Sequence, residues 1–286
     1  MPFTKEPVKF RGEAGWIAGD RFPHSGPERG TAVMLHGGGQ TRHSWSRAAE
    51  KIAAHGWEVY TFDARGHGES DWAPDGDYGL GALVSDLRAV LEQLADTART
   101  PVLFGASMGG MTSLVAEGEH PGSARALVLV DITPKIEPEG IARISAFMRA
   151  APDGFADLEE VADAVARYRP NTKRPRNIEG LRKNVRAGAD GRLYWHWDPA
   201  FHELGANLDK PLENRARMLA AASRIAVPTL LIRGGRSDVV SQEGADELQR
   251  LIPHAAAVDV AGVGHMVAGD DNAVFVERAV EFLDAL

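Results

Sequence analysis

The sequence PVLFGASMGG, at residues 101–110, gives the strongest indication of the fold. Its centre fits Gly-x-Ser-x-Gly around Ser107, the apolar run 101–104 precedes it, and residues 111–120 can form a helix. A buried strand, a sharp turn with a serine at its tip and a helix make a nucleophile elbow. Glycines flank the serine because the turn is strained and its neighbours leave no room for side chains. Taken alone, the pattern also fits an ordinary glycine-rich turn.

Apolar runs recur on both sides of this stretch and predict buried strands. They lie at residues 32–35, 59–62, 102–104, 126–130, 229–232 and 256–260. Most lack strict alternation, as in strands covered on both faces. Helical periodicity marks 80–94 and 276–283, and 8–22 resembles a hairpin. The pattern predicts an α/β fold with a mostly parallel, doubly wound sheet, whose functional groups gather beyond the carboxyl ends of the strands.

The alternation breaks after the strand that ends at Val130. Residues 133–212 contain seven prolines and helix-like segments such as 141–149 and 158–168, without strand-like runs. The segment is too long for a plain connection. We predict a core of residues 1–132 and 213–286 and a helical lid of residues 133–212 over the carboxyl edge. A surface excursion without function is the alternative.

Composition limits the possible partners. The 286 residues carry a formal charge of −8, which argues against binding to nucleic acid or to an anionic membrane surface. Cysteine is absent, which excludes disulfides and thiolate sites. No apolar run approaches the ~20 residues of a membrane span, and the N-terminus lacks the apolar segment of a signal peptide. We therefore expect a cytoplasmic protein that acts without a membrane.

A base must activate Ser107, and a histidine oriented by a carboxylate is the usual solution. His265 lies in the loop just beyond the run 256–260, and Asp238 lies just past the run 229–232. All three residues follow strands at the same edge, in the chain order of elbow-type hydrolases. The prediction is a catalytic triad in which His265 is the general base and Asp238 the orienting acid.

An oxyanion hole needs two backbone N–H groups aimed at the developing alkoxide. Met108, directly after the serine, should supply one of them. The loop HGGGQ at residues 36–40 should supply the other, through Gly38 or, failing that, Gly37. A phosphate loop is the competing interpretation, but the chain lacks the required lysine-containing pattern.

These motifs together resemble the α/β-hydrolase superfamily, in its lid-bearing branch. The resemblance covers nearly the whole chain outside the lid and includes the turn DARGHGES at residues 63–70. It implies that this turn, with His67, is structural. It also implies an acid after the penultimate strand, which Asp238 supplies. Some members place the acid one strand earlier, where Asp131 stands.

The nucleophile indicates the chemistry. Similar-looking epoxide hydrolases and dehalogenases use an aspartate at the elbow, whereas a serine indicates attack on a carbonyl. Hydrolysis of a carboxylic ester or lactone through an acyl-enzyme is the leading prediction, without metal or organic cofactor. Ring-cleavage hydrolases, which break carbon–carbon bonds, and haloperoxidase-like esterases with perhydrolase activity are also similar to this chain. A ligand receptor with a retained triad is the non-enzymatic alternative.

Clues to the substrate are sparse. We expect a small carbonyl compound with an apolar part, because aromatic side chains gather in the lid around residues 193–201. These aromatics could equally form the core of the lid itself. The residues expected to line the pocket are His43, Trp45, Trp195, Trp197, Met266 and Val267.

Overall fold

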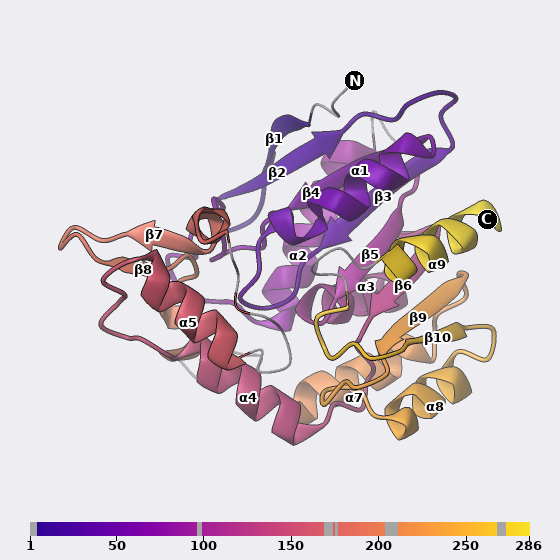
Figure 1. Cartoon of the computed structure of the whole chain (residues 1–286). Helices are drawn as coiled ribbons and strands as arrows, with labels where there is room; N and C mark the ends of the chain where they lie inside the picture. The colour runs from indigo at the N-terminus through magenta and orange to yellow at the C-terminus, as the bar shows by residue number, and fades with distance from the viewer. Residues whose placement is uncertain (1–4, 96–98, 169–173, 175–176, 204–210, 268–272) are drawn as a thin grey trace.

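An eight-stranded sheet forms the centre of the molecule, with the order β1-β2-β4-β3-β5-β6-β9-β10 (Figure 1). The computed structural model describes residues 5–95, 99–168, 174, 177–203, 211–267 and 273–286. The strands are β1 (Glu6–Arg11), β2 (Trp16–Phe22), β3 (Gly30–Leu35), β4 (Trp57–Phe62), β5 (Val102–Ala106), β6 (Ala126–Val130), β9 (Thr229–Gly234) and β10 (Ala256–Val260). From β4 to β10 along this order the strands pair in parallel, while β1–β2 and β2–β4 are antiparallel. The predicted fold class is confirmed.

Helices cover both faces of this sheet. The short 3-10 helix η1 (Arg42–Trp45) leads into α1 (Ser46–Ala54), which packs on one face with α9 (Ala273–Asp284). The other face carries α2 (Leu80–Leu94), α3 (Met108–Glu119), α7 (Pro211–Ala222) and α8 (Gln242–Leu251). The helices therefore shield both faces of the sheet from water, which explains why the strands are continuous apolar runs in the sequence.

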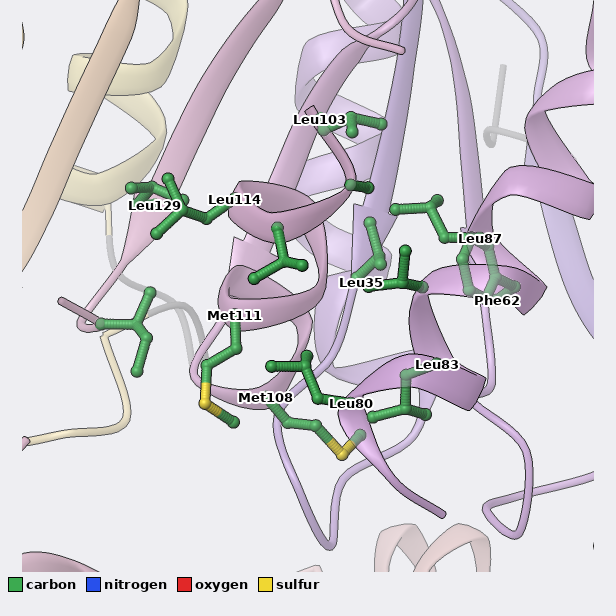
Figure 2. Packing of buried hydrophobic residues seen from close by; sticks show 14 of the residues in the cluster. Leu35, Phe62, Leu80, Leu83, Leu87, Leu103, Met108, Met111, Leu114 and Leu129 are labelled. Atoms are coloured by element: carbon green, nitrogen blue, oxygen red, sulfur yellow. The ribbon is translucent and has the colours of Figure 1, made fainter. Parts of the chain in front are cut away.

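Strand β3 shows how the sequence divides between the two faces. Ala32 and Met34 pack on the α1/α9 side, and Val33 and Leu35 pack on the α2/α3 side. This is the two-residue period of a strand. Figure 2 shows side chains of β3, β4, β5 and β6 meeting α2 and the first turns of α3. The labelled residues include Leu35, Phe62, Leu83, Leu87, Leu103, Met108, Met111, Leu114 and Leu129.

A long insertion separates β6 from β9. It contains α4 (Pro138–Met148), α5 (Leu158–Tyr168), the 3-10 helix η2 (Glu179–Asn184), β7 (Val185–Ala187), β8 (Leu193–Trp195) and α6 (Ala200–Glu203). In Figure 1, α4, α5 and the β7–β8 hairpin gather to one side of the main sheet. The expectation of a segment without strands was wrong, because the two strands have three residues each and are too short to show periodicity.

The division into core and lid stays a prediction, but its end at residue 212 falls inside α7. Met218 of that helix packs in the same hydrophobic cluster as α3, so α7 belongs with the layer that covers the main sheet. Among the helices of the described ranges, none is long and apolar enough to cross a membrane.

Candidate active site

Ser107 sits at a strained turn between β5 and α3. Its backbone angles are φ 47° and ψ −113°, in a region that L-residues rarely adopt. A Cβ on Gly105 would lie 2.4 Å from the Gly109 carbonyl oxygen, and a Cβ on Gly109 would lie 2.4 Å from the Leu35 oxygen. The glycines are therefore needed for close packing, and the strand–turn–helix arrangement predicted around the serine is present.

A cavity of about 540 Å³ opens beside this turn, and both Ser107 and His265 line it. Its walls are mainly apolar side chains. Helix α4 of the insertion contributes Ile141, Ile144 and Met148, and α7 contributes Met218. The insertion thus encloses the space in front of the serine, in the manner of a small-molecule pocket.

His265 is held by Asp131, which directly follows β6. The distance between His265 Nδ1 and Asp131 Oδ2 is 2.6 Å. The Asp131 carboxylate is fully buried and also accepts hydrogen bonds from the Gly234 N–H, at 2.8 Å, and from the Ser237 hydroxyl. Because a carboxylate only accepts, the proton of a neutral imidazole lies on Nδ1, and Nε2 remains able to take a proton.

The structure contradicts the prediction that Asp238 orients His265. Asp238 instead forms an ion pair with Arg143 of α4, with a shortest N–O distance of 2.6 Å. A turn closed by the Ser237 N–H and the Gly234 carbonyl lies between β9 and Asp238, and it is Ser237, not Asp238, that reaches Asp131 beside His265. Asp131, at φ 50°, turns inward one residue after its strand. The alternative position, one strand earlier, is the one that the geometry supports.

The loop after β3 leaves the Gly38 N–H available to a ligand in the cavity. The Gly37 N–H donates to Gln40 Oε1 at 3.0 Å, and the Gly39 N–H donates to His67 Nε2 at 3.2 Å. Between them, Gly38 lines the cavity, and its N–H has no acceptor among the described residues. Gly38 therefore remains the oxyanion-hole candidate, whereas the Gly37 N–H is already committed to Gln40.

Met108 also lines the cavity, at the first position of α3. The first N–H groups of a helix have no intrahelical acceptor, and the helix dipole favours negative charge there. The Met108 N–H therefore suits the second oxyanion-hole position that the sequence predicts.

Two buried histidines contact this loop. His36 donates from Nδ1 to the Gly37 carbonyl at 2.8 Å and accepts the Ala64 N–H at Nε2, at 2.9 Å. Burial lowers the pKa of His36, so the ring stays neutral. His67 bonds to the backbone of Gly39 and Arg65 and lies outside the cavity lining, in keeping with the structural role that the resemblance implies.

Of the six residues expected to line the pocket, Met266 and Val267 do so. Trp45 is instead fully buried against Phe275 on the α1/α9 face, and His43 lies beside Asp20. These two side chains are on the wrong side of the loop to reach the cavity.

Trp195 and Trp197 do not line the cavity either. Their rings stack at 4.9 Å, and Trp195 donates its indole N–H to the Ala150 carbonyl. They form the hydrophobic core of the insertion, which is the alternative that the sequence left open for these aromatics. Part of the apolar wall of the cavity comes instead from α4, whose residues the sequence marks as helical but not as pocket-facing.

Within the described ranges, no group of three or more histidine or carboxylate side chains is arranged to hold a metal ion.

Comparison with known proteins identifies the family. The family model of the alpha/beta hydrolase fold matches residues 32–271, so the chain belongs to the alpha/beta-hydrolase family. The resemblance seen in the sequence is confirmed, and hydrolysis is the general activity that the family supports.

Two relatives and one solved structure illustrate the match. The chain is 28% identical over 288 residues to esterase Rv0045c of Mycobacterium tuberculosis, covering 97% of this chain and 90% of the relative. It is 31% identical over 259 residues to the sn-1-specific diacylglycerol lipase ABHD11 of Mus musculus, covering 88% of this chain and 80% of the relative. An alpha/beta hydrolase from Novosphingobium aromaticivorans shares the fold with a TM-score of 0.83 at 22% identity, over 99% of both chains.

Proposed function

We propose that the protein hydrolyses carboxylic esters or lactones through an acyl-enzyme on Ser107. His265 is the general base and acid, and Asp131 is the orienting acid. One observation carries the proposal: the 2.6 Å contact of His265 with the buried Asp131, in a chain whose elbow serine lines the same cavity as that histidine. A nucleophile, a base and a group that orients the base are what acyl transfer requires.

The chemistry proceeds in two halves. Ser107 Oγ attacks the substrate carbonyl carbon while His265 Nε2 takes the hydroxyl proton, and Asp131 stabilises the resulting imidazolium. The carbonyl oxygen becomes an oxyanion that the N–H groups of Gly38 and Met108 stabilise. Collapse of the intermediate expels the alkoxide, which takes the proton from His265. Water, deprotonated by His265, then attacks the acyl-enzyme and releases the acid and Ser107.

The cavity walls support an apolar acyl or alcohol group. Ile141, Ile144 and Met218 face the same space as the serine, and burial of a hydrocarbon chain against them is favourable by ~25 cal/mol per Å². The two relatives compared above are called an esterase and a diacylglycerol lipase, and ester hydrolysis agrees with both names. Carbon–carbon hydrolysis, perhydrolysis and ligand reception remain the alternatives.

The test is turnover of p-nitrophenyl esters from acetate to palmitate by wild type and Ser107→Ala. We expect sustained release by wild type, faster for butanoate or longer chains than for acetate. Ser107→Ala should lower kcat by a factor of roughly 10⁴–10⁶. Turnover that survives this substitution would refute the serine mechanism. A single burst or no release from folded wild type would favour the alternatives.

A further inference from the structure

We propose that His67 is a positioning residue that holds the Gly39 N–H and thereby fixes the Gly38 N–H at the candidate oxyanion hole, and that His196 supports His67 in this position. His67 comes from the turn after β4, and His196 comes from the insertion, directly after β8. The inference rests on the proposed function, since it concerns how the hole of that same site is kept in place.

His67 accepts the hydrogen bond that holds Gly39 in place. The side chain is fully buried, and its Nδ1 lies 3.1 Å from the Arg65 carbonyl oxygen, to which it donates. Nε2 of the neutral ring is then an acceptor, and it receives the Gly39 N–H at 3.2 Å. The His67 ring is itself packed edge-on against Phe201, with ring centres 5.0 Å apart. The acceptor therefore has a fixed position.

His196 supports His67 from the insertion. Its Nδ1 accepts the Gly68 N–H at 2.8 Å, so the ring proton must lie on Nε2. This Nε2 is buried and has no hydrogen-bond partner among the described residues. The His196 ring packs against the His67 ring, with ring centres 5.7 Å apart, and therefore restricts the position of that acceptor.

Gly39 needs such external support. It has φ 71° and no side chain, so only its peptide groups can fix its orientation. With the Gly37 N–H on Gln40 and the Gly39 N–H on His67, the intervening Gly38 N–H keeps one direction. A preorganised donor stabilises an oxyanion far better than one that must reorient during the reaction.

The same region connects the insertion to the candidate oxyanion hole. Near His196, the Asp198 N–H donates to the Gly66 carbonyl at 2.8 Å, and the Tyr78 hydroxyl donates to the Asp198 carboxylate. The insertion is thus docked on the same turn that carries His67. Weakening the contacts of Asp198 with Gly66 and Tyr78 should therefore disturb the candidate oxyanion hole without changing Ser107 or His265.

A matched pair of amide substitutions tests the role of His67. In His67→Gln the amide oxygen can occupy the position of Nε2 and still accept the Gly39 N–H. In His67→Asn the shorter amide reaches only the position of Nδ1 and loses that bond. We expect His67→Asn to lower kcat by about 10- to 100-fold with KM nearly unchanged, because oxyanion stabilisation acts in the transition state. His67→Gln should keep most of the activity.

A second readout separates positioning from a general effect on the fold. The binding of a trifluoromethyl ketone, which forms an oxyanion on the active serine, should weaken in His67→Asn by the same factor as kcat. Binding of the free carboxylic acid product should not change. The exposed His254 provides the surface control, and His254→Asn should match wild type in kcat, KM, ketone binding and product binding.

His196→Asn carries the same test if His67→Asn does not fold. Its amide can still accept the Gly68 N–H, but the substitution removes the ring that packs against His67, so kcat and ketone binding should fall together, by a smaller factor than for His67→Asn. Equal activity of His67→Asn and His67→Gln, or a loss of kcat with unchanged ketone binding, would overturn the inference while leaving the proposed function intact. Absence of Ser107-dependent turnover in wild type would overturn both.

Discussion

Asp131 determines the geometry of the site because its two oxygens accept three hydrogen bonds in full burial. An ionised carboxylate in such surroundings is fixed in position, and it fixes the tautomer of His265. Asp238, by contrast, is partly exposed and paired with the exposed Arg143, an arrangement worth at most about 1 kcal/mol.

The different environments of Asp131 and Asp238 predict which substitution lowers kcat more. Asp131→Asn should lower kcat by about 10³- to 10⁴-fold, because the amide can donate to Nδ1 and favours the wrong tautomer. Asp238→Asn should leave kcat within about threefold of wild type, since it removes only a surface ion pair. Steady-state kinetics of the two variants on one p-nitrophenyl ester checks the ranking. The reverse order would return the acid to Asp238.

His196 gives a prediction about stability and pH. Its pKa is lowered from 6.5 to about 4, so between these values the unfolded chain binds a proton that the folded protein does not. The free energy of unfolding therefore falls as the pH decreases through this window. Between about pH 7 and about pH 5, wild type should lose about 2 kcal/mol more than His196→Asn, which cannot titrate. Urea unfolding at both pH values measures the difference, and equal losses would contradict it.

The elbow works as one element because α3 starts against β3. Gly109 touches the backbone and the side chain of Leu35, with no space for a methyl group. Gly81, in the first turn of α2, has more room, because a Cβ there would lie 3.5 Å from its nearest outside atom, Arg217 Nη1. The two glycines therefore differ in packing although both lie in helices.

A paired alanine substitution tests this difference. Gly109→Ala should lower the free energy of unfolding by about 2–3 kcal/mol and disturb the elbow, because neither backbone can move aside easily. Gly81→Ala should be neutral or stabilising by up to about 1 kcal/mol, as expected for a helical glycine with room. Thermal and urea unfolding provide the comparison. A tolerated Gly109→Ala would mean that β3 and α3 can separate.

The elements that can be predicted from sequence are those with strong local signals. Buried parallel strands are continuous apolar runs, and the elbow needs glycines at fixed places, so the sequence predicts both with nearly correct bounds. The β7–β8 hairpin has an Asp190-Gly191 turn, but its strands have three residues each and are too short to show the alternation that would mark a hairpin. The aromatic residues Trp195 and Trp197 are ambiguous in sequence, because composition does not distinguish a helical lid's own core from a pocket wall.

Only the folded structure shows which of two carboxylates orients His265. Asp131 and Asp238 both follow strands, and β6 and β9 are neighbours in the sheet. Which carboxylate turns toward His265 depends on the positive φ of Asp131 and on the turn after Gly234. Neither feature has a sequence signal as clear as a glycine pattern. The residues of the site are therefore predictable as candidates, and their pairing is visible only in three dimensions.

The molecule as a whole forms the cavity between its sheet edge and the insertion. Ile144 of α4 lines that cavity, whereas Ala146 of the same helix is exposed and does not. Ile144→Trp should fill part of the space and shift the preferred p-nitrophenyl ester toward shorter acyl chains, with at least about a tenfold loss on octanoate relative to acetate. Ala146→Trp is the matched control and should keep the wild-type profile. Unchanged chain-length preference in Ile144→Trp would place the acyl group elsewhere.

Covalent labelling of the nucleophile tests the assigned serine and its acid together. A fluorophosphonate reacts with an activated serine, and peptide mass analysis locates the adduct. We predict a single adduct on Ser107, formed at a rate that falls steeply in Asp131→Asn and little in Asp238→Asn. An adduct on another residue, or an Asp131→Asn rate equal to that of wild type, would contradict the assignment.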